Sequence, residues 1–142
     1  MTTWNITIFG QPAGMPRARS VRTKWGGIRH YIPQKSPGVV YRSIAAKLSS
    51  RKPKLEGPVR VTIGCVFEMP KSWSKAKKLK HDGQPHTQKP DGDNIAKAIL
   101  DGLSECWPDD AVVWELIVRK VWGQHGSTVV FVTDTTEGEY TP

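Results

Sequence analysis

Cysteines and long apolar runs are scarce in this 142-residue chain. Its two cysteines, Cys65 and Cys106, are too few for a disulfide framework and lack the spacing of a zinc-binding CxxC pair. No apolar run approaches the roughly 18 residues that a membrane span needs. The first ten residues also lack the basic start and apolar stretch of a signal peptide. We therefore expect a cytoplasmic protein without cysteine chemistry.

Each end of the chain lacks charge of one sign. Residues 1–54 hold eleven Lys and Arg and no carboxylate, whereas residues 123–142 hold three carboxylates and no Lys or Arg. The middle segment is balanced, so the formal net charge is +8. A stretch with positive charge alone repels itself unless it faces a polyanion, and nucleic acid is therefore the partner that we expect. The alternative is a basic surface that serves solubility only.

Apolar periodicity predicts an α+β protein. Alternating residues indicate strands near residues 4–9, 59–67, 112–119 and 127–133, and helical spacing indicates helices from about 37 to 48 and 93 to 105. The Gly123–Gly126 segment predicts that the last two strands pair as a hairpin. The element order implies a two-layer sandwich, in which helices cover one face of a mixed sheet of about four strands. We expect one domain over residues 1–133 and a polar, acidic tail over 134–142.

Three further segments have distinctive patterns. Residues 10–35 mix many Gly and Pro with Lys and Arg, which predicts a mobile basic loop without regular structure. The segment Lys71–Lys80 is basic with interleaved apolar residues, a pattern that fits a short helix or a lid over a ligand. In the first helix, four apolar residues fall on one stripe: Val40, Ile44, Ala45 and Leu48.

Carboxylates gather between residues 89 and 110. Asp91 and Asp93 are two residues apart in an expected extended entry to the second helix, so that their side chains point the same way. Parallel carboxylates repel each other unless a hard divalent cation neutralises them, and Mg²⁺ binds one or two carboxylates together with waters and phosphate oxygens. Asp109 and Asp110 begin the next strand, where only one of the two can face this cluster. Spacing alone leaves either one open.

A lysine accompanies these carboxylates. Lys97 lies one helical turn after Asp93 on the same face, within reach of a phosphate held at a metal. Three carboxylates and a lysine on a basic chain fit metal-assisted phosphodiester hydrolysis, with water as the nucleophile.

Each of these residues also has a plainer interpretation. Asp93 or Asn94 can cap the helix, Lys97 can pair with Asp101 on a solvated face, and the Asp109–Asp110 pair can form a turn. The chain would then be a non-catalytic, basic DNA-binding module. The coincidence of all these features favours a nuclease.

The run Asp91-Gly-Asp-Asn-Ile-Ala-Lys97-Ala-Ile-Leu-Asp101, followed by Asp109-Asp110-Ala-Val-Val, resembles the RusA-type Holliday junction resolvases, a family of crossover junction endodeoxyribonucleases. Upstream, residues 10–19 are similar to the family's G-x-P segment with spaced arginines, and Tyr31-Ile-Pro33 is similar to its next landmark. The similarity runs from about residue 4 to residue 133.

This resemblance implies a RusA-like α/β fold and a Mg²⁺-dependent or Mn²⁺-dependent homodimeric endonuclease without a small-molecule cofactor. Such an enzyme resolves four-way DNA junctions by paired symmetric cuts in recombination and repair. Asp91, Asp93 and Asp110 match the family's metal-binding carboxylates, and Lys97 matches its active-site lysine. The same chemistry would also serve other branched DNA, such as flaps or forks.

Symmetry and charge add to these expectations. A junction with two-fold symmetry is cut on two opposed strands, which a two-fold symmetric dimer reaches with its two sites. Cations of the N-terminal basic segment are expected to contact the DNA backbone. These residues are Arg17, Arg19, Arg22, Lys24, Arg29 and Lys35.

Overall fold

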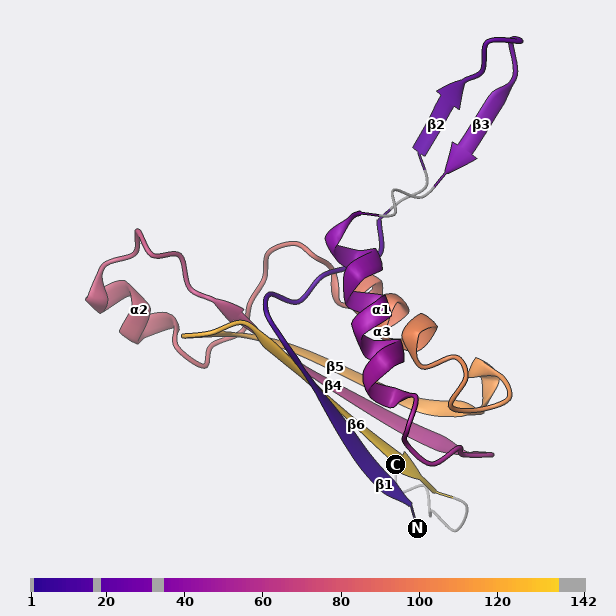
Figure 1. The fold of residues 1–142 in the computed structure, drawn as a ribbon. Helices are drawn as coiled ribbons and strands as arrows, with labels where there is room; N and C mark the ends of the chain where they lie inside the picture. The colour runs from indigo at the N-terminus through magenta and orange to yellow at the C-terminus, as the bar shows by residue number, and fades with distance from the viewer. Residues whose placement is uncertain (1, 17–18, 32–34, 136–142) are drawn as a thin grey trace.

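The computed structural model describes residues 2–16, 19–31 and 35–135. A four-stranded sheet forms its centre (Figure 1). In spatial order, its strands are β1 (Thr3–Phe9), β6 (Ser127–Asp134), β4 (Val59–Glu68) and β5 (Val113–Gly123). The β4–β5 pair is parallel and the other two pairs are antiparallel, which confirms the predicted mixed sheet.

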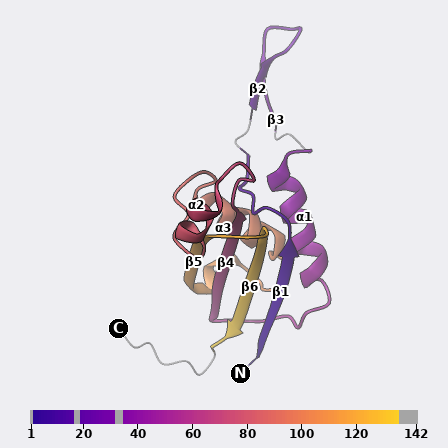
Figure 2. The same cartoon turned by 90° about the vertical axis from the view of Figure 1, so that its left-hand side faces the viewer.

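Two helices, α1 (Pro37–Ser49) and α3 (Gly92–Gly102), lie side by side on one face of this sheet (Figures 1 and 2). The predicted two-layer α+β architecture is therefore confirmed. A shorter helix, α2 (Lys75–His81), lies beyond one end of the sheet, and a 3-10 turn, η1 (Asp110–Val112), precedes β5. Within the described residues, no helix is long and apolar enough to cross a membrane.

Strand β4 supplies the middle of the core. Every second residue of the strand is buried beneath the helices, whereas Arg60 and Glu68 on the alternate face are exposed. The buried residues are Val59, Val61, Ile63, Cys65 and Phe67. The hydroxyl of Tyr41 on α1 donates a hydrogen bond to Thr128 of β6, which satisfies a polar group inside this layer. Burial raises the pKa of Tyr41.

The apolar stripe on α1 is turned largely away from the core. Of its four residues only Ala45 is buried, while Val40 is 49%, Ile44 38% and Leu48 40% exposed. The buried side chains come instead from an adjacent face that includes Val39 and Tyr41. Helical spacing reports that a stripe exists, but the neighbouring elements decide which face is covered.

The predicted β5–β6 hairpin is wrong, because β4 lies between these two strands. The segment after β5 crosses the end of β4, where the amide of Met69 donates to the carbonyl of Gly123 at 3.0 Å. Strand β6 then pairs with β4, placing Val130 beside Ile63. The glycines do reverse the chain, but apolar pairing with β4 selects the neighbouring strand.

The expectation that residues 10–35 lack regular structure is also wrong. β2 (Arg19–Arg22) and β3 (Ile28–Tyr31) form an antiparallel pair that projects from the rest of the molecule (Figure 1). At their turn the amide of Thr23 donates to the carbonyl of Gly27 at 2.7 Å, and Gly26 has a φ of 84°. Glycine permits this left-handed conformation, so its presence marks the turn of a hairpin here. We call residues 19–31 the basic arm.

Candidate active site and DNA-binding arm

The N-terminal end of α3 positions the two central carboxylates. Asp91 is the N-cap residue with an extended backbone, and Asp93 lies in the first helical turn. The expectation that both belong to an extended entry is therefore wrong for Asp93, because the helix begins at Gly92. The positive end of the helix dipole favours anionic groups at this place. It thereby lowers the repulsion between neighbouring carboxylates.

Asp91 does not act as an ordinary helix cap. Its side chain makes no capping hydrogen bond, although it occupies the N-cap position. The Lys89 ammonium instead lies 2.8 Å from each oxygen of its carboxylate, in a solvent-accessible ion pair. Because such exposed pairs contribute little to stability, a metal ion or a phosphate can compete for these groups at low cost.

Lys97 and Asp93 share the exposed face of α3, as their spacing predicts. The opposite face of the helix is buried against the core and includes Ile95, Ala98 and Ile99. Within the described residues, Lys97 forms no salt bridge with Asp101 or any other carboxylate. Its ammonium is therefore available to an anion that approaches the start of α3.

Asp110 does not belong to α3, which carries Asp91 and Asp93 at its N-terminal end. It begins η1, and its Oδ1 accepts a hydrogen bond from Nε1 of Trp107 at 2.9 Å. Asp109 caps the same turn by accepting from the amide of Ala111 at 2.7 Å. In the chain, η1 follows the C-terminal end of α3, whereas Asp93 lies in the first turn of that helix. Among the described residues, no three His, Cys, Asp or Glu side chains are grouped closely enough to hold one metal.

The basic arm carries most of the cations that the sequence assigns to DNA. Arg19 and Arg22 lie on β2, Lys24 in the turn and Arg29 on β3, and all four are exposed. Trp25 is 91% exposed in the turn of the arm. Lys35 is exposed just before α1, and Arg17 lies outside the described residues, as do Ile32 and Pro33 of the Tyr31-Ile-Pro33 landmark.

Sequence reasoning missed Gly14, which joins this arm to the site. The amide of Met15 donates to the carbonyl of Asn94 on α3 at 3.2 Å. A Cβ on Gly14 would lie 2.9 Å from the Cβ of Asn94 and 3.2 Å from that of Pro90, so only glycine fits without displacement. Gly38 on α1 closes the other side, since its own Cβ would collide with the carbonyl of Gly14. A single glycine such as Gly14 does not contribute to a helical or strand periodicity in the sequence. Its role is therefore visible only in the packing of the folded chain.

A comparison with known protein families finds a match that covers most of the chain. The pattern of the family described as endodeoxyribonuclease RusA matches residues 10–133. The chain belongs to the RusA family. A search of curated proteins finds no match. Membership in the RusA family implies Holliday junction resolvase activity, that is, hydrolysis of DNA at branched junctions.

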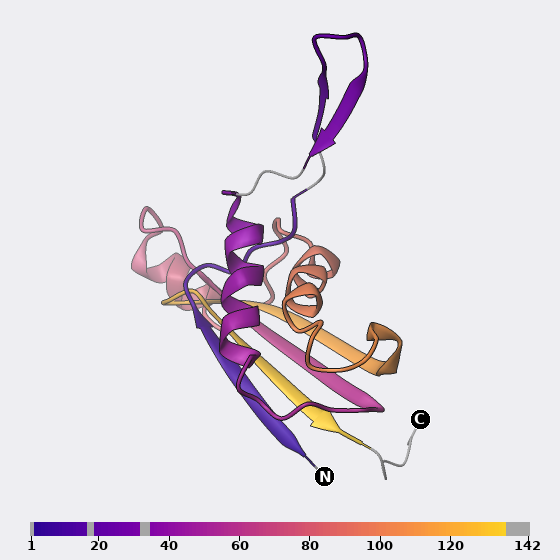
Figure 3. The same ribbon diagram turned by 45° about the vertical axis from the view of Figure 1, so that its right-hand side comes forward.

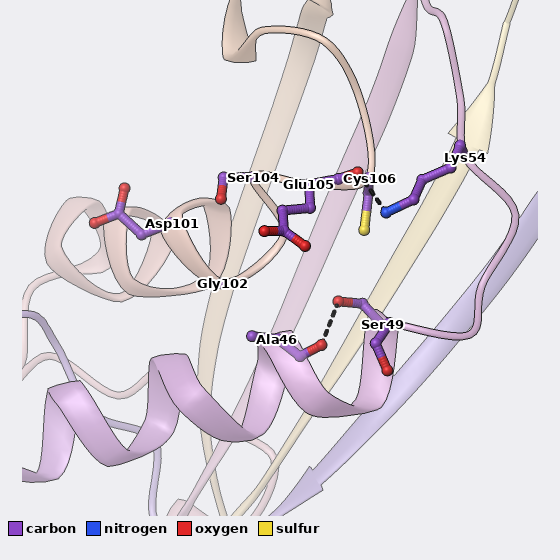
Figure 4. Close-up of a pocket in the computed structure, with 9 residues that line it drawn as sticks. Ala46, Ser49, Lys54, Asp101, Gly102, Ser104, Glu105 and Cys106 are labelled. Atoms are coloured by element: carbon purple, nitrogen blue, oxygen red, sulfur yellow. Dashed lines mark hydrogen bonds between the residues drawn. The ribbon is translucent and has the colours of Figure 1, made fainter.

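A small pocket in this RusA-family chain lies away from Asp91 and Asp93. It has a volume of about 200 Å³ and opens between the C-terminal ends of α1 and α3 (Figure 4). Its lining includes Asp101, Glu105 and the buried thiol of Cys106. The ammonium of Lys54 donates to the carbonyl of Glu105 at 2.6 Å, so it binds the pocket's own backbone. The pocket is at the opposite end of α3 from Asp91 and Asp93.

Proposed function

We propose that the protein is a metal-dependent endonuclease that resolves Holliday junctions by paired, symmetric phosphodiester hydrolysis. One observation carries this proposal: in a chain that the RusA family matches over residues 10–133, Asp91, Asp93 and Lys97 lie in the N-terminal part of α3, and Asp93 and Lys97 are exposed. Gly14 packs the segment leading to the basic arm against the same end. The proposed catalytic residues and the segment that leads to the basic arm therefore meet at the N-terminal end of α3.

Asp91 and Asp93 are the residues that we propose to hold Mg²⁺ or Mn²⁺. Two accessible carboxylates at one helix end fit an ion that binds one or two carboxylates and keeps several waters and phosphate oxygens as ligands. When bound, the ion supplies Lewis-acid polarisation of the phosphate and lowers the pKa of a bound water. The protein's own part is to hold the carboxylates and to admit the DNA backbone.

Lys97 is proposed to act on the reacting phosphate. Its exposed ammonium is one helical turn from Asp93, and no described carboxylate neutralises it. Negative charge increases on the phosphate oxygens during attack by water, and a fixed cation stabilises that charge more than it stabilises the ground state. Lys97 therefore contributes to turnover more than to binding.

A homodimer is proposed for two reasons. Paired cuts on opposed strands require two active sites related by two-fold symmetry. In addition, among the described residues Asp110 is not grouped with Asp91 and Asp93 of its own chain as a set that could hold one metal. We propose that Asp110 of the partner subunit completes each site.

The direct test uses a synthetic four-way junction and a linear duplex of matched sequence. Purified protein and an Asp93→Asn variant are incubated with each DNA in Mg²⁺ and in EDTA. Denaturing gels report cleavage and native gels report binding. Paired nicks should appear on the junction alone and require both Mg²⁺ and Asp93, while the variant retains junction binding or gains affinity, because it loses a negative charge near phosphate.

Other outcomes point to the alternatives. Junction binding without any metal-dependent nick would favour a non-catalytic DNA-binding module. Efficient cutting of flaps or forks, but not of four-way junctions, would transfer the same chemistry to another branched substrate.

A further inference from the structure

Helix α2 carries dense positive charge outside the site described above. Four of its seven residues are lysines, and Lys71 precedes it closely in the chain. The four are Lys75, Lys77, Lys78 and Lys80. None of the seven residues is buried, so α2 has no apolar face packed into the core. A helix this short is not stable by itself in water, and other contacts must hold it.

Trp73 provides those contacts at the start of α2. Its ring centroid lies 4.9 Å from that of Trp122 on β5 and 4.8 Å from that of His81. The hydroxyl of Ser74 caps the helix by accepting from the amide of Lys77 at 3.2 Å. The Lys77 ammonium lies 4.4 Å from the centre of the Trp73 ring, a cation–π geometry. Trp73 thus links α2 to β5 through contacts with Trp122 and with His81 at the end of the helix, while Lys75 and Lys80 are exposed to solvent.

The charge on α2 has no counter-ion in the described part of the chain. The two salt bridges found there join Arg60 to Glu115 and Lys89 to Asp91. Lysines of α2 are spaced three residues apart in two pairs, which places like charges next to each other on the helix surface. A helix that served solubility alone would gain stability from carboxylates at those spacings. A polyanion relieves this repulsion directly.

The position of α2 indicates which polyanion surface it reaches. α2 and the basic arm extend from the molecule in different directions, and the N-terminal end of α3 lies between them (Figures 1 and 3). A branched DNA whose cleaved phosphate sits at α3 has duplex arms that diverge from that point. DNA held by the basic arm therefore leaves α2 facing another part of the junction.

We propose that the lysine face of α2 binds the phosphate backbone of a second duplex arm, separate from the DNA that the basic arm contacts. The inference rests on the proposed function, because that function supplies the branched DNA. Lysine contacts to phosphate position a duplex without reading its sequence. α2 accordingly contributes affinity and junction orientation, and no preference for bases.

A triple variant, Lys75→Gln, Lys78→Gln and Lys80→Gln, tests this surface and leaves Lys77 on Trp73. The matched control removes the same charge from the last turn of α1 and the segment that follows it, through Lys47→Gln, Arg51→Gln and Lys52→Gln. Junction affinity of the full chain is measured in EDTA between about 50 and 200 mM salt. The slope of log K against log salt should fall by roughly 2 to 3 in the α2 variant, at about 0.9 per lost phosphate contact, and by less than about 1 in the control.

A charge-preserving triple variant with arginine at the same three positions should restore the slope, which excludes misfolding as the cause. Hydroxyl-radical footprints should show that the glutamine variant loses protection on duplex regions that a basic-arm variant, Arg22→Gln with Arg29→Gln, still protects. An unchanged slope would overturn the inference even if the protein nicks junctions. A reduced slope without Mg²⁺-dependent nicking would support the α2 contact and refute the proposed nuclease. Absence of all junction binding would overturn both.

Discussion

At the scale of single residues, the two faces of α3 have different roles. Its buried side chains hold the helix on the sheet, whereas Asp93 and Lys97 on the exposed face make no contact that the fold requires. Substitution of an exposed residue away from special contacts changes stability by about 0.5 kcal/mol or less. The exposed pair can therefore be altered to test chemistry without unfolding the protein.

Lys97→Ala should reduce the rate of junction cleavage by roughly 100-fold or more, as expected for removal of a charge that acts in the transition state. Junction affinity should change little, because one cation among many contributes only one phosphate contact. Single-turnover cleavage and gel-shift titration measure the two effects separately. Lys47→Ala on α1 is the matched control and should change neither. Equal losses of cleavage rate and junction affinity in Lys97→Ala would indicate that Lys97 only contacts the DNA backbone and does not act on the reacting phosphate.

His86 gives the fold a defined pH dependence. Its ring stacks on Phe67 at a centroid distance of 3.7 Å, and its Nδ1 is buried without a hydrogen-bond partner in the described structure. Burial, aided by the nearby charge of Lys120, lowers the pKa of His86 below its usual value of 6.5. The unfolded chain therefore binds a proton at a higher pH than the native chain does, and stability falls as the pH drops below about 6.5.

His86→Phe should remove this loss, because phenylalanine keeps the stack and cannot be protonated. The wild type is expected to lose up to about 1.4 kcal/mol per pH unit through this group, which urea unfolding at pH 7.5 and 5.5 measures. His30→Phe, on the exposed basic arm, is the control and should keep the wild-type slope. A wild-type slope in His86→Phe would show that other groups cause the pH dependence.

At the scale of the elements, the faces of α1 show how context overrides a local pattern. Its stripe of Val40, Ile44 and Leu48 is nearly half exposed, while the sheet covers an adjacent face. Leu103, immediately after α3, is fully buried and gives a matched comparison for Leu48.

Leu48→Ala should destabilise the protein by less than about 1 kcal/mol, and Leu103→Ala by about 2 to 5 kcal/mol, since only the second leaves a cavity in the core. Chemical denaturation of both variants at one protein concentration makes the comparison. Equal losses would mean that the α1 stripe is covered in solution. That result would place a subunit contact on α1.

At the scale of the whole molecule, the proposed homodimer makes an unusual prediction for mixed subunits. If each site combines Asp93 of one subunit with Asp110 of the partner subunit, a dimer of one Asp93→Asn and one Asp110→Asn subunit has one intact site and one doubly altered site. If both residues act within one chain, neither site is intact. Arrangement across the dimer therefore decides whether two inactive variants complement each other.

Co-expressed Asp93→Asn and Asp110→Asn subunits should regain nicking, although each variant alone is inactive. Random pairing makes half of the dimers mixed, so roughly a quarter of wild-type sites should be active, and each junction should receive single nicks instead of paired cuts. Denaturing gels with each strand labelled in turn distinguish the two products. Differently tagged subunits verify that mixed dimers have formed. If these mixed dimers remain inactive, Asp110 does not complete the partner's site, and its role is the hydrogen bond with Trp107 in its own chain.

The amino-acid sequence alone predicts the type of most elements and the shared helical face of two residues of the proposed active site, Asp93 and Lys97. Two-residue alternation predicts the strands of the main sheet, because each side chain of a strand faces either the core or the other side. The same reading places Asp93 and Lys97 on one helical face, since their spacing is one turn. These features depend only on residues close together in the chain.

The neighbours of each element, in contrast, follow from the folded structure. β4 separates β5 from β6, α1 turns its stripe outward, and Asp110 is not grouped with Asp91 and Asp93 in the part of the chain that the structure describes. The basic arm pairs two short, exposed strands whose composition resembles a loop. Local sequence patterns predict whether a side chain is buried or exposed. They do not predict which element it packs against, because that depends on contacts between distant segments that form only in the folded chain.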